Sequence, residues 1–181
     1  MQAAVGNLES VYMDIYCIDN VYGEVSVVKV TSNIDGNYSV EIDDEELVVN
    51  VVDGQGIGTI ALDSGNYTAK INFADDNYDI SIKNDSFTVF KANVTVIIEV
   101  SDEVYGCDVT GNVFASVDGD YTVIINNKTV IVNVNNGIGS FNIGILNAGT
   151  YNAFISFNKT NYNPVENKTT FKVTKAESNI K

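Results

Sequence analysis

One strand-like phrase occurs twice in the chain, and this repetition limits the fold more than any other feature. The phrase reads GNYTAKINF from Gly65 and GTYNAFISF from Gly149. Other landmarks recur in the same order in both halves: VYG, then DGxYxVxI, then FxVxKA. Self-similarity at a fixed period indicates modules of one fold in series. We therefore expect two homologous domains, residues 1–92 and 93–181.

Each half shows the alternating pattern of half-buried β-strands. Apolar side chains occupy every second position from Val11 to Cys17 and from Tyr67 to Phe73, and the second half repeats both runs. Period-two alternation favours strands, and the Gly, Asn and Asp clusters between runs favour the turns of a sandwich. The first half predicts strands over residues 11–17, 24–31, 37–43, 46–53, 57–62, 67–74 and 84–91. The predicted fold class is all-β: two tandem immunoglobulin-like β-sandwiches of about seven strands each.

The repeated phrase begins with the D-x-G-x-Y spacing that starts strand F in immunoglobulin-like domains. Tyr67 and Tyr151 occupy the tyrosine position. In a tyrosine corner this side chain turns back over the preceding loop, and its hydroxyl bonds a backbone group upstream. We expect two structural tyrosine corners. Ala69 and Ala153 stand where an antibody domain places its second Cys, so packing alone holds these sandwiches together.

The halves meet at Lys91–Val94 with almost no linker. A junction this short favours domains stacked end to end as a rod over domains that swing freely. We expect a monomer in solution.

Charge and composition exclude several classes of function. The formal net charge is −14, every basic residue is Lys, and His and Trp are absent. Such a chain repels phosphate, so nucleic acid and anionic membrane surfaces are not expected partners. Without His, imidazole bases and Ser–His–Asp or Cys–His sites are excluded. No run approaches the roughly 18 to 20 apolar residues of a membrane span, and QAAVGNLES after Met1 does not resemble a signal peptide.

The whole order of landmarks resembles the Ig-like repeat of bacterial and archaeal surface proteins, particularly the adhesin-like proteins of methanogens. The resemblance covers about residues 11–176 and both repeats. It implies an extracellular, multi-repeat stalk or adhesin fragment at the cell surface. Two cysteines and an acidic hairpin depart from the shared pattern: Cys17, Cys107, and Asp43, Asp44, Glu45 and Glu46.

Acidic clusters are the only candidates for a metal site. Ca²⁺ takes six to eight oxygen ligands, and the hairpin Asp43, Asp44, Glu45 and Glu46 is the weak candidate for it. Asp75–Asp76, Asp118 and Asp120 are further acids near turns. None has the spacing of a calcium loop, so solvated hairpin acids are the favoured interpretation and we expect no cofactor. A pair of carboxylates facing across a cleft, as glycoside hydrolysis needs, is not expected in domains this small.

Three other motifs have structural interpretations. Gly54-Gln55-Gly56-Ile57-Gly58 lacks the Lys and helix of a phosphate loop and predicts a hairpin turn. Cys17 faces the core and Cys107 the surface, so free thiols are expected. A Lys–Asn isopeptide cross-link from Lys29 to Asn50 or Asn72 is an alternative for the first half. The second half has Asn112 where the first has Lys29, so it has no such lysine.

Surface chemistry offers two further candidate features. Seven N-x-Ser/Thr sequences are candidate glycosylation sites: Asn37, Asn66, Asn84, Asn93, Asn127, Asn158 and Asn167. Several aromatic side chains are candidates for exposure: Tyr12, Tyr16, Tyr22, Tyr105 and Phe154. A flat cluster of such residues on one sheet face would favour ligand binding.

We expect a non-catalytic extracellular stalk or adhesion module from a larger cell-surface protein. The alternative is a ligand-binding module that recognises a host- or cell-surface protein by strand addition, or a glycan through exposed Tyr. A carboxylate hydrolase is a third hypothesis, from another class. Neither a nucleic-acid partner nor membrane insertion of this segment is expected.

Overall fold

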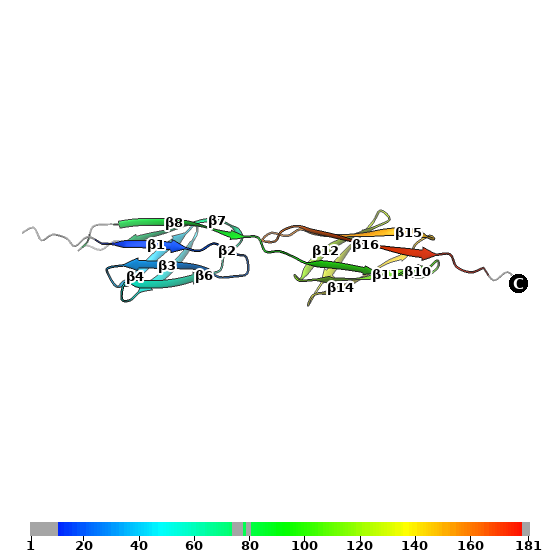
Figure 1. Ribbon diagram of the computed structural model, residues 1–181, viewed down its shortest axis with the longest axis horizontal. Coiled ribbons are helices and arrows are strands. Elements are labelled where there is room, and N and C mark those ends of the chain that lie inside the picture. The colour runs from blue at the N-terminus through cyan, green and yellow to red at the C-terminus, as the bar shows by residue number, and fades with distance from the viewer. Residues whose placement is uncertain (1–10, 74–77, 79–80, 179–181) are drawn as a thin grey trace, which may run out of the picture. The chain divides into compact units, whose positions relative to one another are not determined.

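The structure is a computed structural model that describes residues 11–73, 78 and 81–178 of the chain. The chain divides into two compact units, Met1–Ala92 and Asn93–Lys181, called unit 1 and unit 2 below. All regular elements in the described residues are β-strands, without a helix (Figure 1). The predicted all-β fold with two sandwiches is confirmed.

Unit 1 is a sandwich of a three-stranded and a five-stranded sheet. Its strands are β1 (Met13–Cys17), β2 (Asn20–Val21), β3 (Ser26–Ser32), β4 (Gly36–Ile42), β5 (Glu45–Val51), β6 (Gln55–Ile60), β7 (Gly65–Phe73) and β8 (Ser81–Phe90). The sheet orders are β1-β3-β6 and β2-β8-β7-β4-β5. All pairings are antiparallel except the short parallel contact of β2 with β8.

Unit 2 repeats this arrangement strand for strand. Its strands are β9 (Val96–Val100), β10 (Glu103–Val104), β11 (Asp108–Ala115), β12 (Gly119–Ile125), β13 (Lys128–Val134), β14 (Ile138–Ile145), β15 (Gly149–Phe157) and β16 (Val165–Thr174). The sheet orders are β14-β11-β9 and β10-β16-β15-β12-β13. A bulge between Val109 and Thr110 shifts the register of β11 against β14, which accommodates one extra residue relative to unit 1.

Each unit closes over its own core because successive strand residues point to opposite faces of a sheet. On β4, Tyr38, Val40 and Ile42 are buried, and the residues between them face outward. The equivalent strand β12 buries Tyr121, Val123 and Ile125 in the same way. Two separate clusters of buried side chains result, one in each unit.

The short strand β2 was not among the predicted strands. Where the chain leaves β1 for the other sheet, the Asp19 carboxylate accepts the backbone N–H of Thr88 at 2.6 Å. The N–H of Tyr22 then bonds the carbonyl of Phe90 at 2.8 Å. A two-residue strand is too short to show any hydrophobic period, so the sequence could not indicate it.

The Gly-rich segment contains a tight turn that is shorter than predicted. It is not the predicted hairpin, because the turn joins β5 to β6, which belong to different sheets. Only Asp53 and Gly54 form it, with φ of 52° and 81°. Gly56 and Gly58 belong to β6 and serve close packing instead. A Cβ atom on Gly56 would lie 2.6 Å from the carbonyl oxygen of Asn50 on β5. Glycine therefore lets the two sheets approach along this side of unit 1.

Candidate functional site

Both predicted corner tyrosines bond backbone carbonyls four residues upstream. The hydroxyl of Tyr67 donates to the carbonyl oxygen of Asp63 at 2.9 Å, and that of Tyr151 to Asn147 at 2.8 Å. This is the geometry of a tyrosine corner. Burial, then the charges of Asp63 and Asp43, raises the pKa of Tyr67 above its ordinary value. Through these bonds the two tyrosines hold the preceding loops in place.

A second pair of tyrosines has the same kind of bond and was missed by the sequence analysis. Tyr38 and Tyr121 are buried, and their hydroxyls donate to the carbonyls of Ile34 at 2.7 Å and Val117 at 2.8 Å. The motif DGxYxVxI contains the signal, because Gly and Tyr are two residues apart there as in the recognised corner.

Two aspartates of this motif hold in place the turns that lead from β5 to β6 and from β13 to β14. The Asp118 carboxylate accepts the backbone N–H groups of Asn136 and Gly137, each at 3.0 Å. In unit 1, Asp35 does the same for Asp53 and Gly54 at 3.1 Å. The bonds from Gly137 and Asn136 hold the pKa of Asp118 below its ordinary value. Asp118 is therefore a turn clamp, while Asp120 accepts a bond from Asn133 at 2.9 Å.

The acidic hairpin does not gather into a metal site. Asp43, Asp44, Glu45 and Glu46 are all exposed. No group of three or more His, Cys, Asp or Glu side chains in the described residues is arranged to hold a metal ion. Asp43, Asp44 and Glu45 line one side of an open groove of about 610 Å³ at the end of unit 1. The other acidic pair considered, Asp75–Asp76, lies outside the described residues.

The two cysteines are free thiols in different environments. Cys17 is buried on β1, and its backbone N–H donates to the carboxylate of Asp85 at 2.8 Å. Burial, and then the charge of Asp85, raises the pKa of Cys17 to about 12. Such a thiol stays protonated at neutral pH and is a poor nucleophile. Cys107 is exposed in the loop between β10 and β11.

The isopeptide alternative is wrong. Lys29 lies on β3 between the buried residues Val28 and Val30, so its side chain leaves the outer face of the three-stranded sheet. Asn50 and Asn72 are exposed on β5 and β7 of the opposite sheet. The core of unit 1 therefore separates the lysine from both asparagines.

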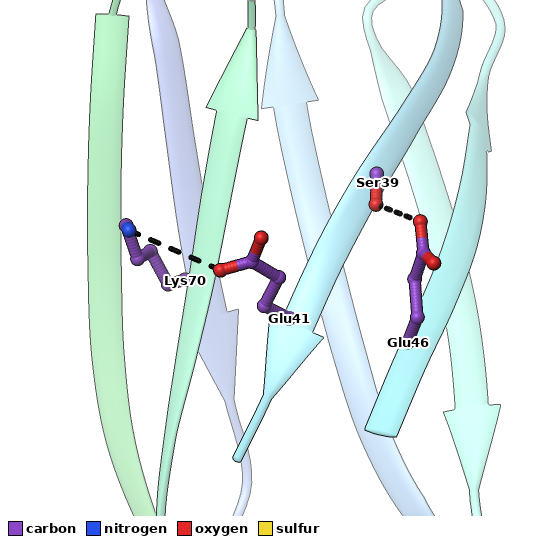
Figure 2. Close-up of polar contacts among 4 residues, drawn as sticks. All are labelled: Ser39, Glu41, Glu46 and Lys70. Carbon is purple, nitrogen blue, oxygen red and sulfur yellow. Dashed lines mark hydrogen bonds and ion pairs between the residues drawn. The ribbon is translucent and has the colours of Figure 1, made fainter. Parts of the chain in front are cut away.

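The outer faces of the five-stranded sheets differ sharply between the units. In unit 1, Glu41 on β4 is paired with Lys70 on β7, and their charged atoms are 3.9 Å apart (Figure 2). Beside them, Ser39 donates a hydrogen bond to Glu46 at 2.5 Å (Figure 2). The centre of this face is polar and charged, and Val48 on β5 and Ile82 on β8 are exposed beside it.

Unit 2 has apolar side chains at the positions of Glu41 and Lys70. Ile124 on β12 is paired directly with Phe154 on β15, and they are 42% and 48% exposed. Ile131 on β13 is 59% exposed and lies diagonally beside Ile124. We call Ile124, Ile131 and Phe154 the apolar cluster of unit 2. A shallow pocket of about 190 Å³ adjoins it, lined by Thr122, Ile124, Phe154, Ile155, Ser156, Glu166 and Asn167.

On the outer faces of the three-stranded sheets, one cross-strand row differs in the same sense. In unit 2, Ile97, Phe114 and Ile138 form one cross-strand row over β9, β11 and β14. The corresponding row in unit 1 is polar: Asp14, Thr31 and Gln55. The adjacent row is reversed, because unit 1 has Tyr16, Lys29 and Ile57 where unit 2 has Glu99, Asn112 and Ser140.

The predicted exposed aromatics are mostly at the surface. Tyr12, Tyr16, Tyr105 and Phe154 are 64%, 58%, 50% and 48% exposed. Tyr22 is different, because it is half-buried and packs against the core of unit 1. Of these residues, Phe154 belongs to the apolar cluster.

All seven candidate glycosylation asparagines are exposed: Asn37, Asn66, Asn84, Asn93, Asn127, Asn158 and Asn167. One of them has a structural role that involves its amide nitrogen. Nδ2 of Asn167 donates to the carbonyl of Val96 at 2.7 Å and ties β16 to the end of β9.

Comparisons with known proteins give distant similarities in fold. No protein-family model matches the chain, and no curated protein matches its sequence.

The described residues contain no helix that could span a membrane.

Among solved structures, the fibronectin(III)-like modules of Clostridium thermocellum CbhA align with a TM-score of 0.40 and 8% identity, over 89% of this chain and 94% of theirs. A tetra-tandem repeat in the extending region of a large adhesion protein aligns with a TM-score of 0.49 and 14% identity, over 91% of this chain and 49% of that one. The adhesin InvE of Yersinia pseudotuberculosis aligns with a TM-score of 0.42 and 13% identity, over 90% and 59%.

The chain thus spans about half of the large adhesion protein's structure. At these identities and TM-scores, the similarities carry no argument about function or partners. The resemblance to methanogen repeats remains a prediction.

Proposed function

We propose that the chain is a non-catalytic module of a larger cell-surface protein of the adhesin-like kind, located outside the cell. Its role is to extend or present other regions of that protein. The observation that supports this role is structural self-sufficiency. Each unit buries its own core, and the same sandwich occurs twice with the boundary between Ala92 and Asn93. Modules in series add length without needing a site of their own.

The surface location can be tested on intact cells. Antibodies raised against the folded chain should label cells without permeabilisation, and protease added outside should remove the label. Labelling that appears only after permeabilisation would contradict the proposal. A chain produced in soluble form should also show no turnover on a panel of glycosides, since a hydrolase needs paired acids across a cleft.

The apolar cluster of unit 2 supports a second candidate function, in which unit 2 binds a ligand itself. Isolated exposed apolar side chains are ordinary, but a contiguous cluster on one sheet face often marks an interaction site. Ile124, Ile131 and Phe154 form such a cluster. Unit 1 has Glu41 and Lys70 in place of Ile124 and Phe154, and it keeps an exposed apolar residue, Val48, at the position of Ile131.

A pair of matched variants distinguishes presentation from binding. The purified chain is applied to glycan arrays and to cells, together with Phe154→Ser in unit 2 and Lys70→Ser at the equivalent position of unit 1. A spacer shows no saturable binding with any of the three proteins. A binding module shows saturable binding that Phe154→Ser abolishes and Lys70→Ser leaves intact.

A further inference from the structure

Three of the N-x-Ser/Thr asparagines lie on a single face of unit 1. Asn37 is on β4, Asn66 on β7 and Asn84 on β8, and all three are exposed. On β4 the buried residues are Tyr38, Val40 and Ile42, so the side chain of Asn37 points to the outer face of the sheet. The same alternation places the other two on the outer face of the five-stranded sheet. Sequence order alone, with these residues far apart in the chain, could not show this grouping.

The three asparagines are spread along the face. Asn84 is paired with Lys70, which is paired with Glu41, so these three residues form one cross-strand row. Asn66 lies four residues before Lys70 on β7, and Asn37 lies four residues before Glu41 on β4. These two strands run in opposite directions. With a rise of about 3.3 Å per residue, each lies about 13 Å from the row, towards opposite ends of the sheet. One asparagine therefore stands at each end and one in the middle.

The hydrogen bonds of these amides are compatible with a glycan on nitrogen. Oδ1 of Asn37 accepts a bond from Nδ2 of Asn50 at 2.8 Å, and Oδ1 of Asn66 accepts one from Oγ1 of Thr88 at 3.0 Å. An N-glycan replaces one hydrogen on Nδ2 and leaves Oδ1 as it was, so both bonds survive modification. Asn167 differs, because its Nδ2 is used in the bond to Val96 and a sugar there would have to fit between β16 and β9.

The corresponding face of unit 2 has no such sequence. Asp120, Thr150 and Lys168 stand where unit 1 has Asn37, Asn66 and Asn84. Glycans at those positions would cover the apolar cluster. The two sheet faces thus differ: that of unit 1 has three acceptor asparagines, and that of unit 2 has the apolar cluster and none of the three.

We propose that Asn37, Asn66 and Asn84 are N-glycosylated and that their glycans cover the outer face of the five-stranded sheet of unit 1. The donor is an oligosaccharide linked to a lipid phosphate. The amide Nδ2 bonds to the anomeric carbon, the bond from that carbon to the lipid phosphate breaks, and the nitrogen releases one proton. This inference rests on the proposed function, because the enzymes of this transfer act on exported chains.

Peptide mapping by mass spectrometry of the protein from the surface fraction of its own cells tests the proposal. We expect a glycan mass on the three peptides that contain Asn37, Asn66 and Asn84, and an unmodified Asn167. Ser86→Ala keeps Asn84 but removes the hydroxyl that the acceptor sequence needs, so it should lose one glycan mass. Asp85→Asn, between these two residues, keeps the acceptor sequence and should retain the glycan.

The outcomes separate this inference from the proposed function. A chain recovered from the surface with Asn37, Asn66 and Asn84 unmodified overturns the inference and leaves the proposed function standing. A chain absent from the surface fraction overturns both. Glycans confined to Asn93, Asn127 and Asn158 also overturn it, because the face of unit 1 would then be bare.

Discussion

Unit 1 and unit 2 have the same strands in the same order, but their outward residues differ in kind. Where unit 1 pairs Glu41 with Lys70, unit 2 pairs Ile124 with Phe154. Inward residues are far more alike, as Tyr38 and Tyr121 illustrate. A strand's inward side must fill a shared core, whereas its outward side meets only water or a partner. The comparison teaches that the inward residues of the strands maintain the shared fold, whereas the outward residues can give each repeat a separate surface role.

The interiors also differ at several places, and at one cross-strand pair the differences compensate within each unit. Val28 on β3 faces Gly58 on β6, while the equivalent pair in unit 2 is Gly111 facing Phe141. Large and small residues have exchanged strands. A Cβ atom on Gly111 would clash with the Phe141 ring and lie 2.7 Å from the carbonyl oxygen of Glu99. The Phe141 ring can lie where it does because residue 111 has no side chain.

Breaking this compensation should have the largest effect. Gly111→Val should destabilise unit 2 by about 3 kcal/mol through overpacking against Phe141. Phe141→Gly should cost about as much through the cavity it leaves. Together the two changes restore the arrangement of unit 1, so the double variant should be more stable than the sum of the single losses by at least about 1 kcal/mol. Hydrogen exchange read peptide by peptide reports the opening free energy of each unit separately.

Val28→Ala in unit 1 is the matched control for the assay. This change should lower the protection of unit 1 against hydrogen exchange and leave that of unit 2 unchanged, since each unit has its own core. Strict additivity of Gly111→Val and Phe141→Gly would mean that the two residues do not share the space, and that the exchange between the units is accidental.

The sequence predicted the sandwiches because period-two alternation is a direct consequence of strand geometry. It also indicated the Tyr67 and Tyr151 positions, where spacing and turn residues coincide. It could not show that Gly111 and Phe141 are compensating partners, because neighbours across the sheet are set by register. The grouping of Ile124, Ile131 and Phe154 was hidden for the same reason. Each strand shows its own outward residues, but only pairing places them side by side.

The second effect, in order of size, comes from the buried tyrosines. The Tyr38 hydroxyl lies 2.7 Å from both the Ile34 carbonyl oxygen and Oγ of Ser32, whereas unit 2 has Ala115 in place of that serine. Tyr38→Phe should therefore cost about 2 kcal/mol and Tyr121→Phe about 1 kcal/mol. Peptide-level hydrogen exchange measures both. Equal losses would show that the serine contributes nothing to unit 1.

A pH-dependent effect should come from the turn clamp of unit 2. Two backbone N–H bonds depress the pKa of Asp118 in the folded state, so the unfolded state binds a proton more readily. The stabilisation is fully present above the ordinary pKa of 3.8 and is lost as pH falls through the lower folded value. Asp118→Asn removes the titrating group.

The free energy of unfolding of the wild-type chain should exceed that of Asp118→Asn at neutral pH. This difference should shrink as the pH falls below the folded pKa of Asp118. Denaturant unfolding at each pH measures it. Asp120→Asn, two residues away, is the control for a general change in acidic charge. A difference between wild type and Asp118→Asn that stays constant over this range would rule out the clamp as its source.

The smallest effect should come from the ion pair that distinguishes the face of unit 1. Glu41 and Lys70 are 63% and 48% exposed, with 3.9 Å between the charged atoms, so water and salt screen their attraction. Glu41→Gln should change the stability of unit 1 by less than about 0.5 kcal/mol, and high salt should remove even that difference. Thermal unfolding at low and high salt measures it. The pair would then matter for what the face presents to its surroundings and not for the fold, which is why unit 2 can replace it with Ile124 and Phe154. A loss of several kcal/mol on Glu41→Gln would instead make the pair part of the folding of unit 1.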